Sequence, residues 1–173
     1  MYRDFDMPQL FSRSCEYALQ ATLFLARYRD RSPILLREIS DSLYIPYHVL
    51  SKTMQSLVRN GIIISNKGTN GGFTLSRPPA ELPLIQIVHA IDGDDILTKC
   101  VLGFPKCGDA KPCPVHDQWV QAKDIILDML YGKNLEELSQ NLDNKINLVE
   151  TLIQRCSECT ADSNKRVDLN TCC

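Results

Sequence analysis

Three observations predict a mainly α fold with a small β-hairpin wing, that is, a winged helix-turn-helix followed by a long dimerisation helix. Two short amphipathic segments, 35–43 and 46–59, are separated by a tight break. An Asn60-Gly61 stop then precedes two β-prone runs around a glycine-rich turn. Further along, segment 114–131 has an apolar stripe too broad to remain in water, formed by Trp119, Ala122, Ile126 and Met129. The order of these elements is more specific than any one of them.

The first two helices are predicted from capping residues and apolar spacing. Segment 11–31 contains good helix formers and is apolar on most sides, which is typical of a buried helix. Ser12 or Ser14 is suited to cap its start, and Cys15 is expected to be a packed core thiol. In segment 35–43 the apolar residues recur every three or four positions, so they share one face.

The third predicted helix has one apolar and one polar side. Pro46 suits the first turn of a helix, and Asn60-Gly61 ends the helix after Arg59. An α-helix fits the major groove of DNA, where polar side chains on its outer side can reach base edges. The alternative interpretation is an ordinary solvated amphipathic helix. The side expected to face inward consists of Val49, Leu50, Thr53, Met54, Leu57 and Val58.

A β-hairpin is predicted directly after this helix. Segments 62–66 and 73–76 are its strands, and the six residues 67–72 between them are rich in turn formers. Glycines at the tip allow the backbone itself to approach phosphates or the minor groove. The predicted DNA contacts are therefore His48, Ser51, Lys52, Gln55, Arg59, Lys67, Thr69, Asn70, Gly71 and Gly72. Of these, we expect Ser51, Lys52 and Gln55 to read bases, and Lys67 with the backbone amides of Gly71-Gly72 to hold phosphate.

The second half of the chain is predicted to contain further helices around a cysteine-containing loop. Segment 84–91 is a short apolar helix, and 114–131 is the long one. Asn134 with Glu137 resembles a capping pair for a last helix that reaches about residue 154. The predicted divisions are 1–79 for the winged helix-turn-helix, 80–154 for the cluster-binding loop and dimerisation helices, and 155–173 for a flexible tail containing cysteines.

The charge of the chain is unevenly distributed. Residues 1–77 carry ten Lys and Arg against six Asp and Glu, whereas residues 78–173 carry nine against fifteen. A basic half joined to an acidic half indicates that one part meets an anion. No apolar run approaches the roughly 18 residues that span a bilayer, and the start lacks a signal-peptide pattern. We therefore expect a cytoplasmic protein without membrane association.

Three cysteines and a histidine lie close together in the loop between the two predicted helices. Cys100, Cys107, Cys113 and His116 are separated by six, five and two residues, with glycines and prolines among them. Soft thiolates suit zinc or an iron–sulfur cluster, and one histidine is compatible with either. The spacing differs from the paired C-x2-C knuckles of a zinc ribbon, so it favours a cluster.

Several short motifs carry a resemblance to one family. They are Glu16-Tyr17-Ala18-Leu19, the helix 45–59, Asn60-Gly61-Ile62, Gly68-x-x-Gly71-Gly72-Phe73, Ile91-Asp92-Gly93 and the three-cysteine loop. With these motifs, residues 10–150 resemble the IscR/NsrR-type (Rrf family) winged-helix regulators of bacteria.

This resemblance implies a homodimer, a promoter site on double-stranded DNA and an iron–sulfur cluster held by the three loop cysteines. Its fourth ligand would be His116, as in the IscR branch, or Glu16 of the partner chain, as in other branches. The local Cys-x-x-His spacing favours His116, and a histidine ligand favours 2Fe–2S, with 4Fe–4S as the alternative. Residues 1–9 and a tail with Cys156, Cys159, Cys172 and Cys173 lie outside the usual family pattern.

The predicted function is that of a DNA-binding transcriptional regulator whose cluster senses iron–sulfur, redox or nitric oxide status. The alternative is a winged-helix regulator that responds through zinc or thiols and holds no cluster. None of the sequence motifs of a nucleophile elbow, a phosphate-binding loop, a zinc protease or a dinucleotide site is present, so no enzyme is proposed.

Overall fold

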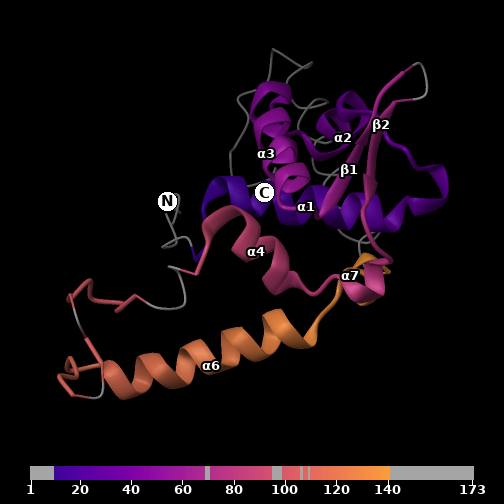
Figure 1. The fold of residues 1–173 in the computed structure, drawn as a ribbon. Coiled ribbons are helices and arrows are strands. Elements are labelled where there is room, and N and C mark those ends of the chain that lie inside the picture. The colour runs from indigo at the N-terminus through magenta and orange to yellow at the C-terminus, as the bar shows by residue number, and fades with distance from the viewer. Residues whose placement is uncertain (1–9, 69–70, 95–98, 106, 109, 141–173) are drawn as a thin grey trace, which may run out of the picture.

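The computed structural model describes residues 10–68, 71–94, 99–105, 107–108 and 110–140. It is mainly helical with one antiparallel hairpin, which confirms the predicted fold class (Figure 1). The elements are α1 (Arg13–Arg27), a 3-10 turn (Arg29–Arg31), α2 (Leu36–Leu43), α3 (Tyr47–Arg59), β1 (Ile63–Asn66), β2 (Gly72–Leu75), a second 3-10 turn (Pro79–Glu81), α4 (Leu84–Asp92), α6 (His116–Gly132) and α7 (Leu135–Ser139).

Helix α1 is tied at its start to the end of α4. Ser12 is its N-cap, and the hydroxyl of Ser12 accepts a hydrogen bond from the backbone N–H of Cys15 at 3.1 Å. The backbone N–H and the hydroxyl of Ser12 both donate to the carboxylate of Asp92. Helix α1 ends at Arg27 and continues as a 3-10 turn, so the helix predicted over 11–31 is shorter than expected.

The hydrophobic core lies between α1 and the helix-turn-helix. Leu25 of α1 is buried together with Leu50, Met54 and Leu57 of α3 and with Ile63 of β1. Small residues on α1 allow this close packing, because Ala18 and Ala21 are also fully buried. The prediction that α1 is buried on several sides is confirmed.

Residues beyond 79 complete the same core. Leu82, Ile87 and Leu135 belong to the cluster that contains Leu25 and Leu50, and both α4 and α7 pack against α1. Hydrogen bonds from Leu135 N to Leu82 O (3.0 Å) and from Leu84 N to Lys133 O (3.1 Å) hold the end of α6 there. The division at residue 79 stays a prediction.

The turn before α3 and the wing are joined through the backbone. Pro46 is the N-cap of α3 rather than its first helical residue, and Tyr44 ends α2 with a left-handed conformation (φ 53°). In the hairpin, Ile63 pairs with Leu75 and Asn66 with Gly72. A bridge between Ile34 and Phe73 adds hydrogen bonds of 3.0 and 2.8 Å, which the sequence did not predict.

Helix α6 extends away from the winged-helix body and carries the cysteine loop at its far end (Figure 1). Only its last turns pack against α4, where Leu130 is buried with Cys15, Ile85 and Val88. Asn134 caps α7 as predicted, since its side chain accepts from the backbone N–H of Glu137. Helix α7 ends at Ser139 with Gln140 as its C-cap, so the continuous helix predicted to reach about residue 154 is wrong, and residues 141–154 lie outside the described residues. Among the helices described, none is both long and apolar enough to span a membrane.

Candidate functional site

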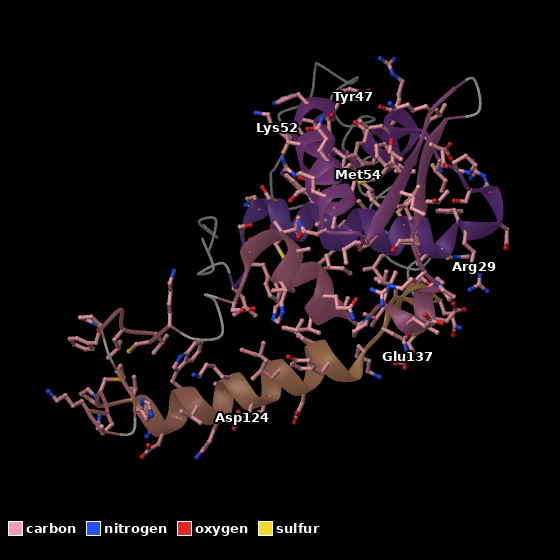
Figure 2. All side chains as sticks on the ribbon, in the orientation of Figure 1. Arg29, Tyr47, Lys52, Met54, Asp124 and Glu137 are labelled. Carbon is pink, nitrogen blue, oxygen red and sulfur yellow. The ribbon has the colours of Figure 1, made fainter. Side chains whose placement is uncertain are left out.

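Helix α3 presents the predicted polar residues on one surface. His48, Lys52, Gln55 and Arg59 are exposed, whereas Ser51 is half-buried towards the wing. The opposite side of α3 packs into the core, where Leu50, Thr53, Met54 and Leu57 are buried. Figure 2 shows Lys52 at the surface of α3 and Met54 inside the body. The predicted inward and outward sides of this helix are therefore confirmed by burial.

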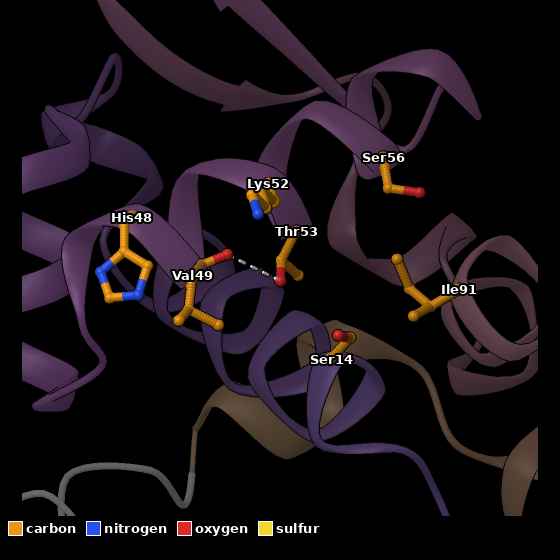
Figure 3. Close-up of a pocket in the computed structure, with 7 residues that line it drawn as sticks. All are labelled: Ser14, His48, Val49, Lys52, Thr53, Ser56 and Ile91. Carbon is orange, nitrogen blue, oxygen red and sulfur yellow. Dashed lines mark hydrogen bonds between the residues drawn. The ribbon is translucent and has the colours of Figure 1, made fainter.

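A groove lies on each side of this polar surface. On the wing side, a cavity of about 440 Å³ is lined by Ser51, Gln55, Val58, Arg59, Ser65 and Phe73. On the α1 side, a cavity of about 420 Å³ is lined by Ser14, His48, Val49, Lys52, Thr53, Ser56 and Ile91 (Figure 3). Lys52 and Gln55 thus border different grooves, a distinction that helical periodicity alone did not provide.

The wing places Lys67 in full exposure beyond the end of β1, as predicted for a phosphate contact. Gly71 and Gly72 have structural reasons to be glycine. A Cβ at Gly71 would lie 2.7 Å from the carbonyl oxygen of Asn66, and one at Gly72 would lie 2.6 Å from that of Ile34. Thr69 and Asn70, which were also predicted to contact DNA, lie outside the described residues.

Two exposed tyrosines adjoin the polar surface of α3 and were missed from the sequence. Tyr44 in the turn is 57% exposed and Tyr47 at the start of α3 is 53% exposed. Figure 2 shows Tyr47 at the outer end of α3. Helix-turn-helix proteins contact base edges with the first residues of this helix. The sequence could have indicated Tyr47, because this residue directly follows Pro46 at the start of the predicted helix. Tyr44 has a left-handed backbone, which only the structure shows.

The loop before α6 brings its three thiols together. The Sγ atoms of Cys100, Cys107 and Cys113 all lie within 4.8 Å of one another. Cys100 Sγ and Cys113 Sγ are 3.7 Å apart, and Cys107 Sγ lies 3.3 Å from Nδ1 of His116. The thiols are half-buried. Residues separated by up to thirteen positions thus converge on one centre at the start of α6.

Local turns produce this convergence. A turn closed by Gly103 N and Cys100 O (2.9 Å) reverses the chain after the first cysteine, with Gly103 at a φ of 71° that favours glycine. A second turn joins Lys111 N to Gly108 O at 2.9 Å. The turns at Gly103 and Gly108 therefore fold the loop back on itself.

The electrostatics of the thiols differ. Burial acts to raise the pKa of Cys100, but backbone hydrogen bonds at Phe104 and Leu102 and contacts with the other two thiols outweigh it and lower that pKa. At Cys107 a backbone hydrogen bond at Cys113 acts to lower the pKa, yet burial and the neighbouring thiols raise it overall. In the metal-free loop Cys100 therefore forms its thiolate more readily than Cys107 does.

The donor set fits a thiophilic metal centre. Two thiolates on one tetrahedral ion with metal–sulfur bonds of about 2.3 Å lie roughly 3.8 Å apart. The 3.7 Å between Cys100 Sγ and Cys113 Sγ matches this separation without rearrangement. An imidazole nitrogen beside Cys107 adds a fourth donor of a type that zinc and iron–sulfur centres both accept.

Glu16 and Cys15 lie apart from this centre within one chain. Both belong to the first turn of α1, and the loop lies at the far end of α6 (Figure 1). The Glu16 carboxylate is 3.3 Å from Nη1 of Arg13. Burial, followed by the charge and hydrogen bond of Asp92, raises the pKa of Cys15 to about 12. Cys15 is therefore a neutral core thiol, as predicted, and Glu16 as a ligand from a partner chain stays a prediction.

An apolar face of α6 is open to solvent. Ile125 is 71% and Met129 48% exposed, and Trp119, Ala122 and Ile126 of the predicted stripe are only half-buried. Of the α6 residues, Leu130 alone is fully buried. Asp124 lies on the side of the helix that faces away from α4 (Figure 2). The helix thus retains an uncovered apolar side along most of its length.

Comparison with known proteins identifies relatives along most of the chain. Residues 11–141 match the family model Rrf2, described as an iron-dependent transcriptional regulator. A putative HTH-type transcriptional regulator of Aquifex aeolicus is 33% identical over 138 residues, which cover 79% of this chain and 94% of that protein. The HTH-type transcriptional regulator IscR of Photorhabdus laumondii is 30% identical over 125 residues, 72% of this chain and 76% of that protein.

Solved structures share the fold at lower sequence identity. CymR (YrzC), the global cysteine regulator of B. subtilis, aligns with a TM-score of 0.64 and 21% identity, covering 76% of this chain and 96% of CymR. T. potens IscR aligns with a TM-score of 0.62 and 20% identity, covering 78% and 90% of the two chains. The family match, the identity to curated relatives and the winged helix agree, and the chain belongs to the Rrf2 family of winged-helix transcriptional regulators.

Proposed function

We propose that this chain is a dimeric, DNA-binding transcriptional regulator whose promoter binding is controlled by an iron–sulfur cluster in loop 100–116. One observation carries the proposal. Three thiols with a histidine beside them converge at the start of α6, the helix whose other end packs against the winged-helix body. A conformational change in the loop would therefore act on α6, the helix that would join two DNA-binding units in a dimer.

DNA contacts are assigned to the outer surface of α3 and to the wing. The exposed side chains His48, Lys52, Gln55 and Arg59, with Ser51 beside them, occupy the side of α3 that would enter the major groove. Lys67 would meet the phosphate backbone from the wing. The net positive charge of residues 1–77 supports an anionic partner.

The uncovered apolar side of α6 is assigned to a second copy of the chain. Apolar patches of this kind on a helix mark interaction sites, and a symmetric dimer is the commonest arrangement. A dimer also supplies two recognition helices, which is what a regulator that reads two half-sites needs. Ile125 and Met129 would lie in the interface.

Cys100, Cys107 and Cys113 would hold the cluster, with His116 or Glu16 of the partner subunit as the fourth ligand. When bound, the cluster supplies an oxidisable group whose state can change under redox or nitric oxide stress. The chain's own part is to gather the ligands, and the lowered pKa of Cys100 makes its thiolate available. A histidine ligand favours 2Fe–2S over 4Fe–4S.

A second candidate is a zinc- or thiol-controlled regulator without a cluster. The grouping of all three Sγ atoms within 4.8 Å of one another favours it specifically, because ligands of one tetrahedral ion lie this close together, whereas a cluster distributes its thiolates over two or more irons. The DNA-binding surface and the dimer helix would serve the same roles in this case.

The test is the colour and metal content of anaerobically purified protein. We expect brown protein that contains iron and acid-labile sulfide, and the Cys107→Ala variant should lose both. Cys159→Ala, which changes a cysteine outside the loop, is the control and should retain them. Colourless protein that contains zinc would support the second candidate, and protein without metal would leave only the thiol form of it.

A further inference from the structure

Trp119 links the start of the cysteine loop to α6. Its indole Nε1–H donates a hydrogen bond of 3.0 Å to the backbone carbonyl of Lys99. Lys99 directly precedes Cys100, so this bond fixes the peptide plane from which the first thiol projects. The sequence suggested Trp119 only as part of an apolar dimer stripe.

The first turn of α6 holds the loop at three places. The ring of His116 lies 3.3 Å from Cys107 Sγ, and the backbone N–H of His116 donates to Cys113 O at 3.0 Å. Trp119, three residues further along in this turn, holds the residue before Cys100. Each cysteine is thus tied, directly or through a neighbour, to the same turn of helix.

We infer that Trp119 is a positioning residue for Cys100 and the internal optical reporter of metal binding in the loop. Because Trp119 lies three residues after His116 on α6, both side chains project from the same side of the helix. The indole N–H sets the direction of the Lys99–Cys100 peptide through its hydrogen bond to the Lys99 carbonyl. On the other side of Cys100, the turn from Cys100 O to Gly103 N sets the direction of the chain. This inference rests on the proposed metal-binding role of the loop.

The position of Trp119 in the chain makes the inference measurable. It is the single tryptophan of the 173 residues, so all tryptophan emission comes from this position. Its indole is half-buried beside the loop and away from the core that stabilises the winged helix. A change in its emission therefore reports the loop rather than the folding of the DNA-binding part.

The experiment uses Trp119→Phe, which retains an aromatic ring and removes the N–H donor. Metal-free full-length protein is titrated with Co²⁺ under anaerobic conditions, and the thiolate-to-cobalt absorption is recorded. We expect cobalt affinity to fall roughly two- to tenfold, the amount expected for one net hydrogen bond. Gln121→Ala, at an exposed position on the same helix, is the matched control and should bind cobalt as the parent protein does.

Two readouts separate positioning from general stability. In the metal-free state, alkylation of Cys100 by iodoacetamide should be faster in Trp119→Phe, whereas the buried Cys15 should stay protected in both proteins. The thermal midpoint should not change. In the parent protein, tryptophan emission should fall in step with cobalt absorption, and Cys107→Ala should show neither change.

Equal cobalt affinity and equal Cys100 alkylation in Trp119→Phe and the parent protein would overturn the positioning role. Cobalt binding without a change in emission would overturn the reporter role. If the parent protein binds neither cobalt nor iron, the metal proposal fails, and the alkylation comparison still decides whether Trp119 positions Cys100.

Discussion

Single residues explain two motifs that the sequence marked without a cause. In Ile91-Asp92-Gly93, the aspartate accepts hydrogen bonds from the backbone and hydroxyl of Ser12 and so joins the end of α4 to the start of α1. In the wing, Gly72 is required because the carbonyl of Ile34 lies where a Cβ would be, at 2.6 Å. Both motifs therefore act within the fold.

The steric role of Gly72 leads to a stability prediction. Gly72→Ala would place a methyl group against the backbone of Ile34 at a φ of 151°, so the hairpin or the Ile34 bridge must shift. We expect the free energy of unfolding in urea to fall by about 1–3 kcal/mol. Gly132→Ala is the control, because nothing lies within 4 Å of a Cβ there, and it should be neutral or slightly stabilising. Equal stabilities would show that the wing adapts freely.

Helix α3 has a different neighbour on each side, and its polar residues divide accordingly. Lys52 borders the groove shared with α1, whereas Ser51 and Gln55 border the groove shared with the wing. When a helix lies in the major groove, its outward residues meet bases and its flanks approach the phosphate backbones. Lys52 is thus better placed for a phosphate than the sequence pattern indicated.

This division predicts distinct effects on DNA binding. Lys52→Gln should weaken binding to any duplex and reduce the salt slope by about 0.9, the value for one phosphate contact. Lys67→Ala should behave in the same way. Gln55→Ala should instead change which sequences are selected from a randomised pool. Fluorescence anisotropy at several salt concentrations measures the slope, with Lys133→Gln, on the loop after α6, as the control. A change in selected sequences caused by Lys52→Gln would assign that residue to base reading.

The whole molecule consists of a winged-helix body and an arm, which is formed by α6 and the cysteine loop at its start. The body is closed by α4 and α7 packing on α1, while α6 extends from it with an open apolar side and the thiol centre at its far end (Figure 1). Because α6 is anchored to the body around Leu130, a displacement of the arm would carry the recognition helix with it. This geometry would couple the loop to the spacing of two half-sites in a dimer.

The arm provides the test of dimerisation. Ile125→Asp places a charge on the uncovered apolar side of α6 at a position that is 71% exposed in one chain. We expect light scattering to show a shift from dimer to monomer and DNA binding to weaken, because two half-sites can no longer be met together. Asp124→Ala, at an exposed position about a quarter-turn away from Ile125 on the same helix, should leave the dimer intact. A parent protein that is monomeric at all concentrations would contradict the assignment of this face.

The sequence by itself determined the order of elements, the inward and outward sides of α3, the cap at Asn134 and the cysteine loop, whereas it left Ser12 and Ser14 as alternative caps of α1. These features depend on local spacing and propensity, which neighbouring residues specify. Only the tertiary structure decided the bridge from Ile34 to Phe73, the contact of Ser12 with Asp92, the meeting of Cys100 with Cys113 and the anchoring of the loop by Trp119. The first two contacts join residues far apart in the chain and arise from how the helices and the wing pack. The thiol contact and the Trp119 bond depend on how the loop turns back onto the start of α6, which residue spacing alone does not specify.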